Sequence, residues 1–138
     1  MFANISVNWW AVIIGSVIQM VTGMIWYNPK TPTGKMWMEA NAMTADSGDR
    51  DKMGLLYFTQ FVASLVIAYV TALFVAYVDP AMLKDGFVLV IWLWLGFLVA
   101  GSAGVYTFPP KPFKLFAMDS IYKLINMLLL VWLFMSWK

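Results

Sequence analysis

The chain has 138 residues, of which 62% are hydrophobic and only 12% are charged. Soluble domains are about half apolar and a quarter charged, so this composition indicates an integral membrane protein. The sequence contains neither Cys nor His, which excludes disulfides and removes the commonest general base and zinc ligand. The net charge of +2 is too small to indicate binding to nucleic acid.

Four apolar segments are long enough to cross a membrane, which takes about 20 residues. The first three end at NP, DP and PP sequences, as expected because proline terminates helices. The start, MFANISVNWWAVII, lacks a basic region and a cleavage site, so we interpret it as the first retained span rather than a signal peptide. The predicted spans are residues 7–27, 54–78, 86–108 and 113–137, all within a single membrane domain of residues 1–138.

The connections between the spans predict their topology. DPAMLKD and PPKP are short, and short links make successive helices antiparallel. We therefore predict an all-α membrane protein, an up-down-up-down bundle of four transmembrane helices. The first connection, residues 28–53, is longer, and its middle, GKMWMEANAM, is either a short helix on the membrane surface or an irregular loop.

The distribution of basic residues predicts the orientation, because short cytoplasmic loops carry an excess of Lys and Arg. The first and third connections hold six basic residues and the opposite side holds two. The six are Lys30, Lys35, Arg50, Lys52, Lys111 and Lys114, and the two are Lys84 and Lys138. We therefore expect loop 28–53 in the cytoplasm and both termini outside it.

Most of the aromatic residues fall near the predicted ends of the spans, as membrane-interface belts require. Trp92 and Trp94 do not, because they lie several residues inside the third span. They either pack or face lipid, or they form a platform for a lipid, quinone or pigment. No other cofactor is predicted.

Small residues predict where helices approach each other closely, since small side chains favour helix association in lipid. The third span holds Gly96, Ala100 and Gly104 at steps of four, and the first holds Gly15 and Gly23. We expect these five positions at helix contacts.

Polar residues of all four spans are predicted at one level of the membrane. At about 1.5 Å per residue, most of them lie about 8 to 15 Å from the cytoplasmic end, and one lies nearer the midplane. The layer comprises Gln19, Thr22, Gln60, Ser64, Ser102, Asp119, Lys123 and Asn126. Because the outer half offers few polar residues, the pattern indicates a polar cluster or a cytoplasm-facing pocket rather than a continuous pore.

The fourth span carries an acidic and a basic residue, Asp119 and Lys123, four positions apart. Charges at this depth are costly and generally indicate function. Asp followed by Lys at i+4 is also the favourable order for an ion pair on a helix. Two interpretations stay open: a structural ion pair, which we favour, or a role in handling a solute, an ion or a proton.

The segments NWWAV, GMIWYNP, GKMWM, LVIAYV, WLWLGFLVAG and KLFAMDSIYKLI resemble, in this order, an uncharacterised bacterial family of four-span integral membrane proteins, a domain-of-unknown-function family. The resemblance covers nearly the whole chain and implies a fold and a membrane location but no established activity. The family tends to have Asn in place of Asp119 and lacks Lys at position 123, which implies that the pair is a local variation. The positions that match its pattern are Asn8, Trp9, Gly23, Trp26, Tyr27, Gly34, Trp37, Ala68, Tyr69, Gly96, Phe97 and Tyr122.

Three classes of function remain. The favoured one is a non-catalytic accessory, structural or assembly subunit that works through helix packing. The alternative is an oligomeric transporter of a small solute, an ion or protons with a cytoplasm-facing polar pocket. An intramembrane enzyme has little support, since no catalytic or metal-binding set of residues is recognisable. The expected partners are membrane lipids and either copies of the chain or a larger complex, and the expected location is the bacterial inner membrane.

Overall fold

A computed structural model describes residues 5–44 and 50–137, and within these ranges every regular element is a helix. Three long helices are continuous: α1 (Trp9–Trp26), α3 (Arg50–Val78) and α6 (Phe113–Ser136). A further long helix is made of three consecutive parts: α4 (Leu83–Leu93), η1 (Trp94–Val99) and α5 (Ala100–Thr107). All four are long and apolar enough to cross a membrane, which confirms the predicted all-α membrane fold.

The first connection contains the short helix α2 (Pro32–Ala40), so the helical alternative for this loop is confirmed. Thr31 caps it by accepting a hydrogen bond from the Gly34 amide at 3.1 Å, and Pro32 occupies the first helical position, where its missing N–H is tolerated. The hydroxyls of Thr31 and Thr33 both donate to the carbonyl of Trp26, the last residue of α1, at 3.2 and 2.5 Å. These bonds hold α2 against the end of α1.

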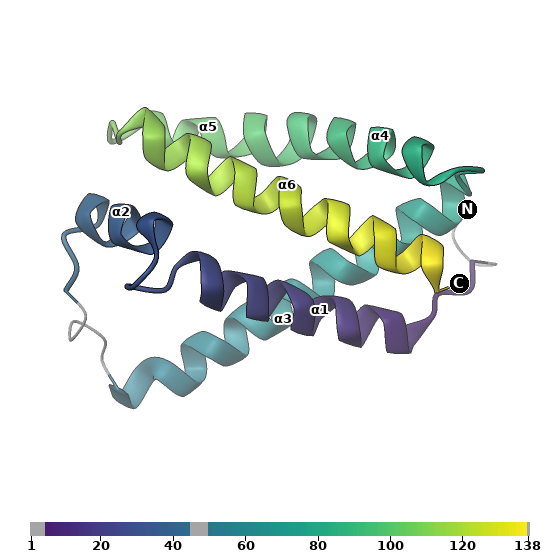
Figure 1. The fold of residues 1–138 in the computed structure, drawn as a ribbon, viewed down its shortest axis with the longest axis horizontal. Coiled ribbons are helices and arrows are strands. Elements are labelled where there is room, and N and C mark those ends of the chain that lie inside the picture. Colours follow the sequence, from purple (N-terminus) through teal and green to yellow (C-terminus); the bar gives the residue numbers. More distant parts are fainter. Residues whose placement is uncertain (1–4, 45–49, 138) are drawn as a thin grey trace.

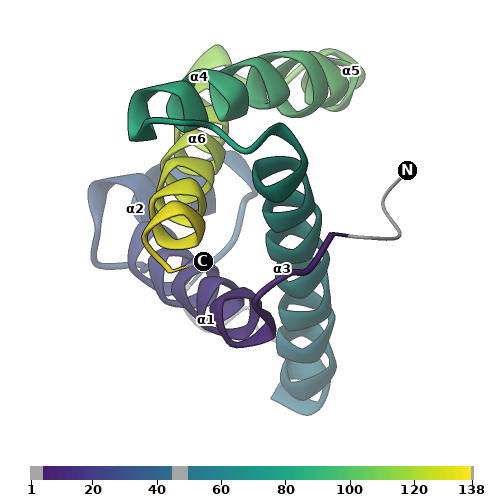
Figure 2. The same cartoon turned by 90° about the vertical axis from the view of Figure 1, so that its right-hand side faces the viewer.

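Helix α6 lies at the centre of the bundle, between α1 and α3 on one side and the third span on the other (Figures 1 and 2). In its most apolar window, 44% of the residues of α6 are buried, against 6% for the third span. The third span therefore packs mainly on α6, and most of its surface has no partner within the described chain. Membrane helices that lack a protein neighbour are covered by lipid or by another subunit.

The hydrophobic core occupies one half of the bundle. It is formed by the N-terminal turns of α1, the C-terminal halves of α3 and α6, and Val90 of α4. Its fully buried members include Ala11, Val12, Ala68 and Leu130. The first half of α3 does not join this core, because it diverges from α6 (Figures 1 and 2) and leaves Leu55 and Phe58 largely exposed. The bundle is thus closed at the end where the termini lie and splayed at the end where α2 lies.

The start of α1 depends on Asn8, whose side-chain oxygen accepts hydrogen bonds from the amides of Trp10 and Ala11 at 3.1 and 3.2 Å. We expect Asn8→Ala to lower the free energy of unfolding by about 1 kcal/mol, because both amides lose their side-chain acceptor. Unfolding in mixed detergent micelles would measure the change. Asn8→Asp, which keeps the acceptor, is the matched control, and an equal loss in both variants would show that the cap contributes nothing.

Candidate functional site

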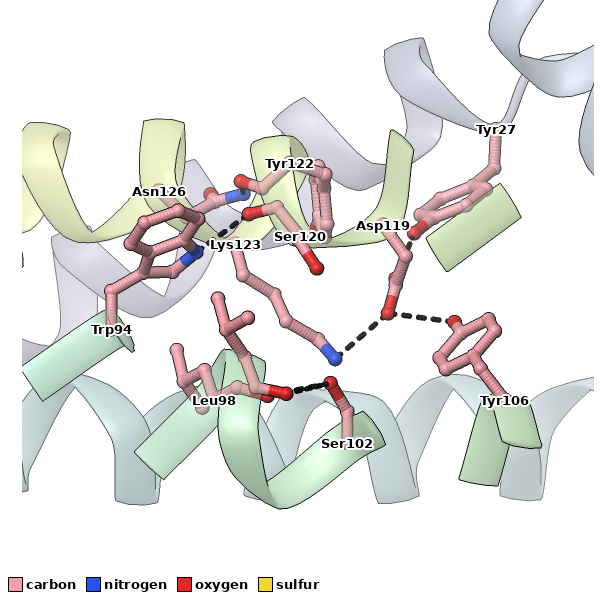
Figure 3. A network of polar contacts seen from close by, with 11 residues as sticks. Tyr27, Trp94, Leu98, Ser102, Tyr106, Asp119, Ser120, Tyr122, Lys123 and Asn126 are labelled. Atoms are coloured by element: carbon pink, nitrogen blue, oxygen red, sulfur yellow. Dashed lines mark hydrogen bonds and ion pairs between the residues drawn. The ribbon is translucent and has the colours of Figure 1, made fainter. Parts of the chain in front are cut away.

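An intramembrane ion pair joins two neighbouring turns of α6. The Lys123 Nζ lies 2.8 Å from Asp119 Oδ2, and the side chains are 32% and 18% exposed, respectively. Asp119 also accepts hydrogen bonds from the hydroxyl of Tyr27, at 2.7 Å, and from that of Tyr106, at 2.9 Å (Figure 3). One carboxylate therefore ties the end of α1 and the third span to α6. Its position inside the bundle agrees with the structural interpretation of the pair.

A second set of polar contacts lies one to two turns deeper and joins α1, α3 and α6. Gln19 is buried and donates to the Ser64 carbonyl at 2.9 Å, while the Tyr122 hydroxyl donates to the Gln19 carbonyl at 3.1 Å. The Thr22 hydroxyl lies 2.6 Å from Oδ1 of Asn126, whose amide donates back to the Tyr122 carbonyl. Polar groups in lipid need such internal partners, so these bonds hold α1, α3 and α6 together below the splayed end.

The structure brings most of the predicted polar layer together. Gln19 and Thr22 of α1, Ser64 of α3 through its carbonyl, and the three polar residues of α6 meet in these two sets of bonds. Ser102 and Gln60 do not join them. The Ser102 hydroxyl bonds to the Leu98 carbonyl of its own helix at 2.6 Å, and Gln60 is exposed on the diverging part of α3.

Two hydrogen-bond partners of Asp119 were not predicted from the sequence. Tyr27 and Tyr106 lie near the ends of their spans, where aromatic residues are expected as interface anchors. For this reason the sequence did not predict them as hydrogen-bond donors to Asp119. The available signal was that all three residues lie within about three turns of the same predicted membrane surface. Depth alone could not say which helices are neighbours.

Aromatic rings form a connected group beside the ion pair. The ring centroids of Tyr27 and Tyr122 are 5.2 Å apart, those of Tyr27 and Trp37 are 5.6 Å apart, and those of Trp26 and Tyr122 are 6.0 Å apart. Gly23 makes room for this group, because a Cβ at that position would lie 2.8 Å from the Tyr122 hydroxyl. The group links α1, α2 and α6 at the splayed end.

Several positions that carry the family resemblance take part in this group, namely Gly23, Trp26, Tyr27, Trp37 and Tyr122. Four others lie at the opposite end of the bundle or in its core: Asn8 caps α1, the rings of Trp9 and Tyr69 stack at a centroid distance of 5.1 Å, and Ala68 is fully buried. Gly34 lies so close to the Asn28 carbonyl that an added Cβ would overlap it. Gly96 and Phe97 lie in η1 and are exposed.

A pocket of about 810 Å³ opens between α1, α3 and α6 at the end where α2 lies. Its polar lining includes Gln19, Gln60, Asp119 and Lys123. The rest of the wall is dominated by aromatic and methionine side chains. These are Tyr27, Trp37, Tyr57, Tyr122, Met20, Met24, Met38, Met43 and Met53. The hydrophobic core lies beyond Gln19, so the pocket ends inside the bundle instead of passing through it.

The predicted packing positions divide into two groups. Gly15 packs against Leu130, and Gly23 packs against Tyr122. Gly96 and Gly104 have no atom within 4 Å of an added Cβ, and Ala100 between them is exposed. The stripe of small residues on the third span therefore makes no helix contact within the described chain.

The two tryptophans inside the third span have different environments. Trp92 is 67% exposed on the outer surface, whereas Trp94 is half-buried and its indole N–H donates to the Ser120 carbonyl at 2.7 Å (Figure 3). Trp94 begins η1, a stretch of π-helix, a form that occurs mostly as single turns and often near functional sites. The π-helix was not predicted, because its wider turn leaves no mark in the hydrophobic pattern. Trp94 fastens the third span to α6.

Comparison with known proteins gives a family but no function. Comparison with curated proteins and with solved structures finds no match to the chain. A family model described as a protein of unknown function, DUF1761, matches residues 10–135, which include all four long helices except the first residue of α1 and the last residue of α6. The chain therefore belongs to the DUF1761 family, whose function is unknown.

Proposed function

We propose that the protein binds a small solute in the pocket at the splayed end and acts as a non-catalytic transporter. The observation that carries this proposal is the pocket itself, which combines a few polar groups, among them the buried Gln19, with a wall of aromatic and methionine side chains. Its volume of about 810 Å³ lies within the usual range for small-molecule sites, about 300 to 1,000 Å³. Ligand sites are mostly apolar with a few placed polar groups, as here.

The closed half of the bundle supports transport with access from one side at a time. The pocket reaches the polar layer, and beyond it the tightly packed core of Ala11, Ala68, Leu130 and Val131 seals the path. Transporters hold their substrate near the midplane and open to one side while closed to the other. The described conformation corresponds to the state that is open at the α2 end.

The orientation we propose places this opening in the cytoplasm. Lys30 and Lys35 lie next to and on α2. At the same end of the bundle, Lys111 lies in the third connection and Lys114 in the first turn of α6 (Figure 1). Short basic loops stay on the cytoplasmic side of a bacterial inner membrane. Both termini would then lie outside the cytoplasm.

A pocket-filling substitution tests the proposal. Gln60 lines the pocket on the exposed part of α3, so Gln60→Trp should occupy the cavity without disturbing the core. We expect a small molecule that is retained during gentle purification in lipid nanodiscs to be depleted in Gln60→Trp. Ala103→Trp, at an exposed position of the third span outside the pocket, is the matched control and should retain it. Mass spectrometry of the extracted small molecules gives the readout, and equal retention in both variants would overturn the proposal.

A second candidate function is an accessory or assembly subunit. It is favoured by the surface of the third span, where Gly96, Ala100 and Gly104 have no helix neighbour in the described chain. Such a stripe permits close contact with a helix of another subunit, either a copy of the chain or a different membrane protein. Purification with a stoichiometric foreign partner would favour this function. Purification as a homo-oligomer would favour transport.

A further inference from the structure

We infer that the pocket accepts an uncharged, flat aromatic molecule that carries a carbonyl oxygen, and that Lys123 is the group that binds this oxygen. The inference rests on the proposed function, since it names the class of solute that the pocket takes. It follows from three features of the lining: the unused hydrogen-bond donors, the balance of charge and the composition of the wall.

Lys123 carries donors for which the described residues provide no acceptor. An ammonium group has three N–H donors, and among residues 5–44 and 50–137 Lys123 has one acceptor, Asp119. Asp119, in contrast, has few free acceptor positions, because its two oxygens already accept from Tyr27, Tyr106 and Lys123. A carboxylate accepts about four hydrogen bonds, so little of its capacity remains. The ion pair can therefore donate hydrogen bonds to a ligand through Lys123, and such a ligand must carry an oxygen acceptor.

The charge balance points to an uncharged acceptor. Asp119 and Lys123 are the two charged residues among the described lining of the pocket, and together they are neutral. A carboxylate or phosphate ligand would leave a net negative charge inside the membrane, and a cation would leave a net positive one, at a cost of several kcal/mol. A carbonyl oxygen can accept from Lys123 without unbalancing the pair.

The amide of Gln19, which also lines the pocket, does not compete for the same role. Gln19 uses its amide N–H groups on the carbonyls of Ser64 and Gly15, at 2.9 and 3.5 Å. Its carboxamide is thereby fixed as part of the bundle. Lys123 also lines the pocket, and its side chain is 32% exposed.

The wall fits a flat apolar body. Trp37, Tyr57 and Tyr122 present aromatic rings, and five methionines line the pocket with them. Aromatic rings stack on flat ligands, while methionine side chains adapt their shape and contact ring edges favourably. The methionines in the wall are Met20, Met24, Met38, Met43 and Met53.

Photolabelling with benzophenone, itself an uncharged diaryl ketone, tests the inference in nanodiscs that contain the full chain. Benzophenone inserts into nearby C–H bonds and reacts readily at methionine, so peptide mass spectrometry can locate the label. We expect labelling at Met20, Met24 or Met53, and we expect competition by naphthyl methyl ketone. Naphthoate, naphthylmethylammonium and ethylnaphthalene share the same ring body and should compete about tenfold less well, as the loss of a hydrogen bond to a charged donor implies.

Variants separate the role of Lys123 from folding. The double variant Asp119→Asn with Lys123→Met removes both charges together, so it avoids an unpaired charge in the membrane. It should bind the ketone about tenfold more weakly than wild type does, whereas Lys114→Met, an exposed lysine of the same helix outside the pocket, should bind it normally. Preferential competition by naphthoate, naphthylmethylammonium or ethylnaphthalene would overturn the ligand class while leaving a solute pocket in place. Labelling confined to residues outside the pocket would overturn both this inference and the proposed function.

Discussion

We expect Asp119→Ala to lower the free energy of unfolding by about 3 kcal/mol, the largest effect of any single polar substitution in this protein. The reason is that one carboxylate binds three groups from three places in the bundle. These are Lys123 of α6, Tyr27 at the end of α1 and Tyr106 of the third span. Removal of the carboxylate leaves an unpaired ammonium and two phenol groups without an acceptor. Unfolding in mixed micelles, followed by the loss of helical circular dichroism, would measure the change.

The matched variants sharpen this prediction. Lys123→Met should cost less than Asp119→Ala, because Asp119 keeps both phenol donors. The double variant Asp119→Asn with Lys123→Met should restore much of the stability, because it leaves no unpaired charge. The asparagine oxygen can accept from one tyrosine, and its amide N–H can donate to the hydroxyl oxygen of the other. Equal and additive losses for the two single variants would mean that the ion pair does not stabilise the bundle.

The second large effect is expected at Gly34, where α2 passes the end of α1. A Cβ at this position would overlap the backbone carbonyl of Asn28, and a backbone atom cannot move aside as a side-chain end can. Gly34→Ala should therefore detach α2 from α1 and lower the free energy of unfolding by about 2 to 3 kcal/mol. The same displacement should separate Trp37 from Tyr27, whose ring centroids are now 5.6 Å apart.

Gly104→Ala is the control for Gly34→Ala, because nothing lies within 4 Å of the added Cβ. Its effect on the free energy of unfolding should stay below about 0.5 kcal/mol. The accessibility of Trp37 to a water-soluble fluorescence quencher, in a background where the other exposed tryptophans are replaced by Phe, would report the position of α2. Unchanged quenching in Gly34→Ala would show that α2 is not held where the structure places it.

Much of the fold could be predicted because the membrane sets the length of a span. The four predicted spans overlie the four long helices, and their ends differ by a few residues. The polar layer could also be predicted, since Asp119, Lys123 and Asn126 fall on one face at i, i+4 and i+7, and depth follows from the rise per residue. Depth and face say at which level a side chain lies.

The depth and the helix face of a side chain do not say which neighbouring helix it contacts. Short links made α3 and the third span antiparallel, yet the third span packs mainly on α6, so Tyr106 became a partner of Asp119. The divergence of α3, which opens the pocket and exposes Gln60, likewise depends on packing between distant segments. A single sequence carries the local periodicity of each helix, but the pairing of helices is decided by the total packing of the bundle.

The two interpretations of the Asp119–Lys123 pair are therefore compatible. The pair is satisfied inside the bundle, which is a structural role, and it also lines the pocket with unused donors on Lys123. A charge that stabilises the fold can present a fixed, preorganised donor to a ligand at little further cost. This combination explains why an expensive group can persist about 9 to 15 Å inside a span.

The most direct test of a pocket that opens at the α2 end is the accessibility of Gln60 to water from that side. The sequence has no cysteine, so a single Gln60→Cys substitution provides one unique thiol for a membrane-impermeant maleimide. Phe97→Cys, at a position 73% exposed on the third span, is the control that should face lipid and resist labelling. A pocket that opens at the α2 end predicts rapid labelling of Gln60→Cys from the side of the first connection and slow labelling from the opposite side. Equal labelling of the two variants, or labelling of Gln60→Cys from the opposite side alone, would contradict it.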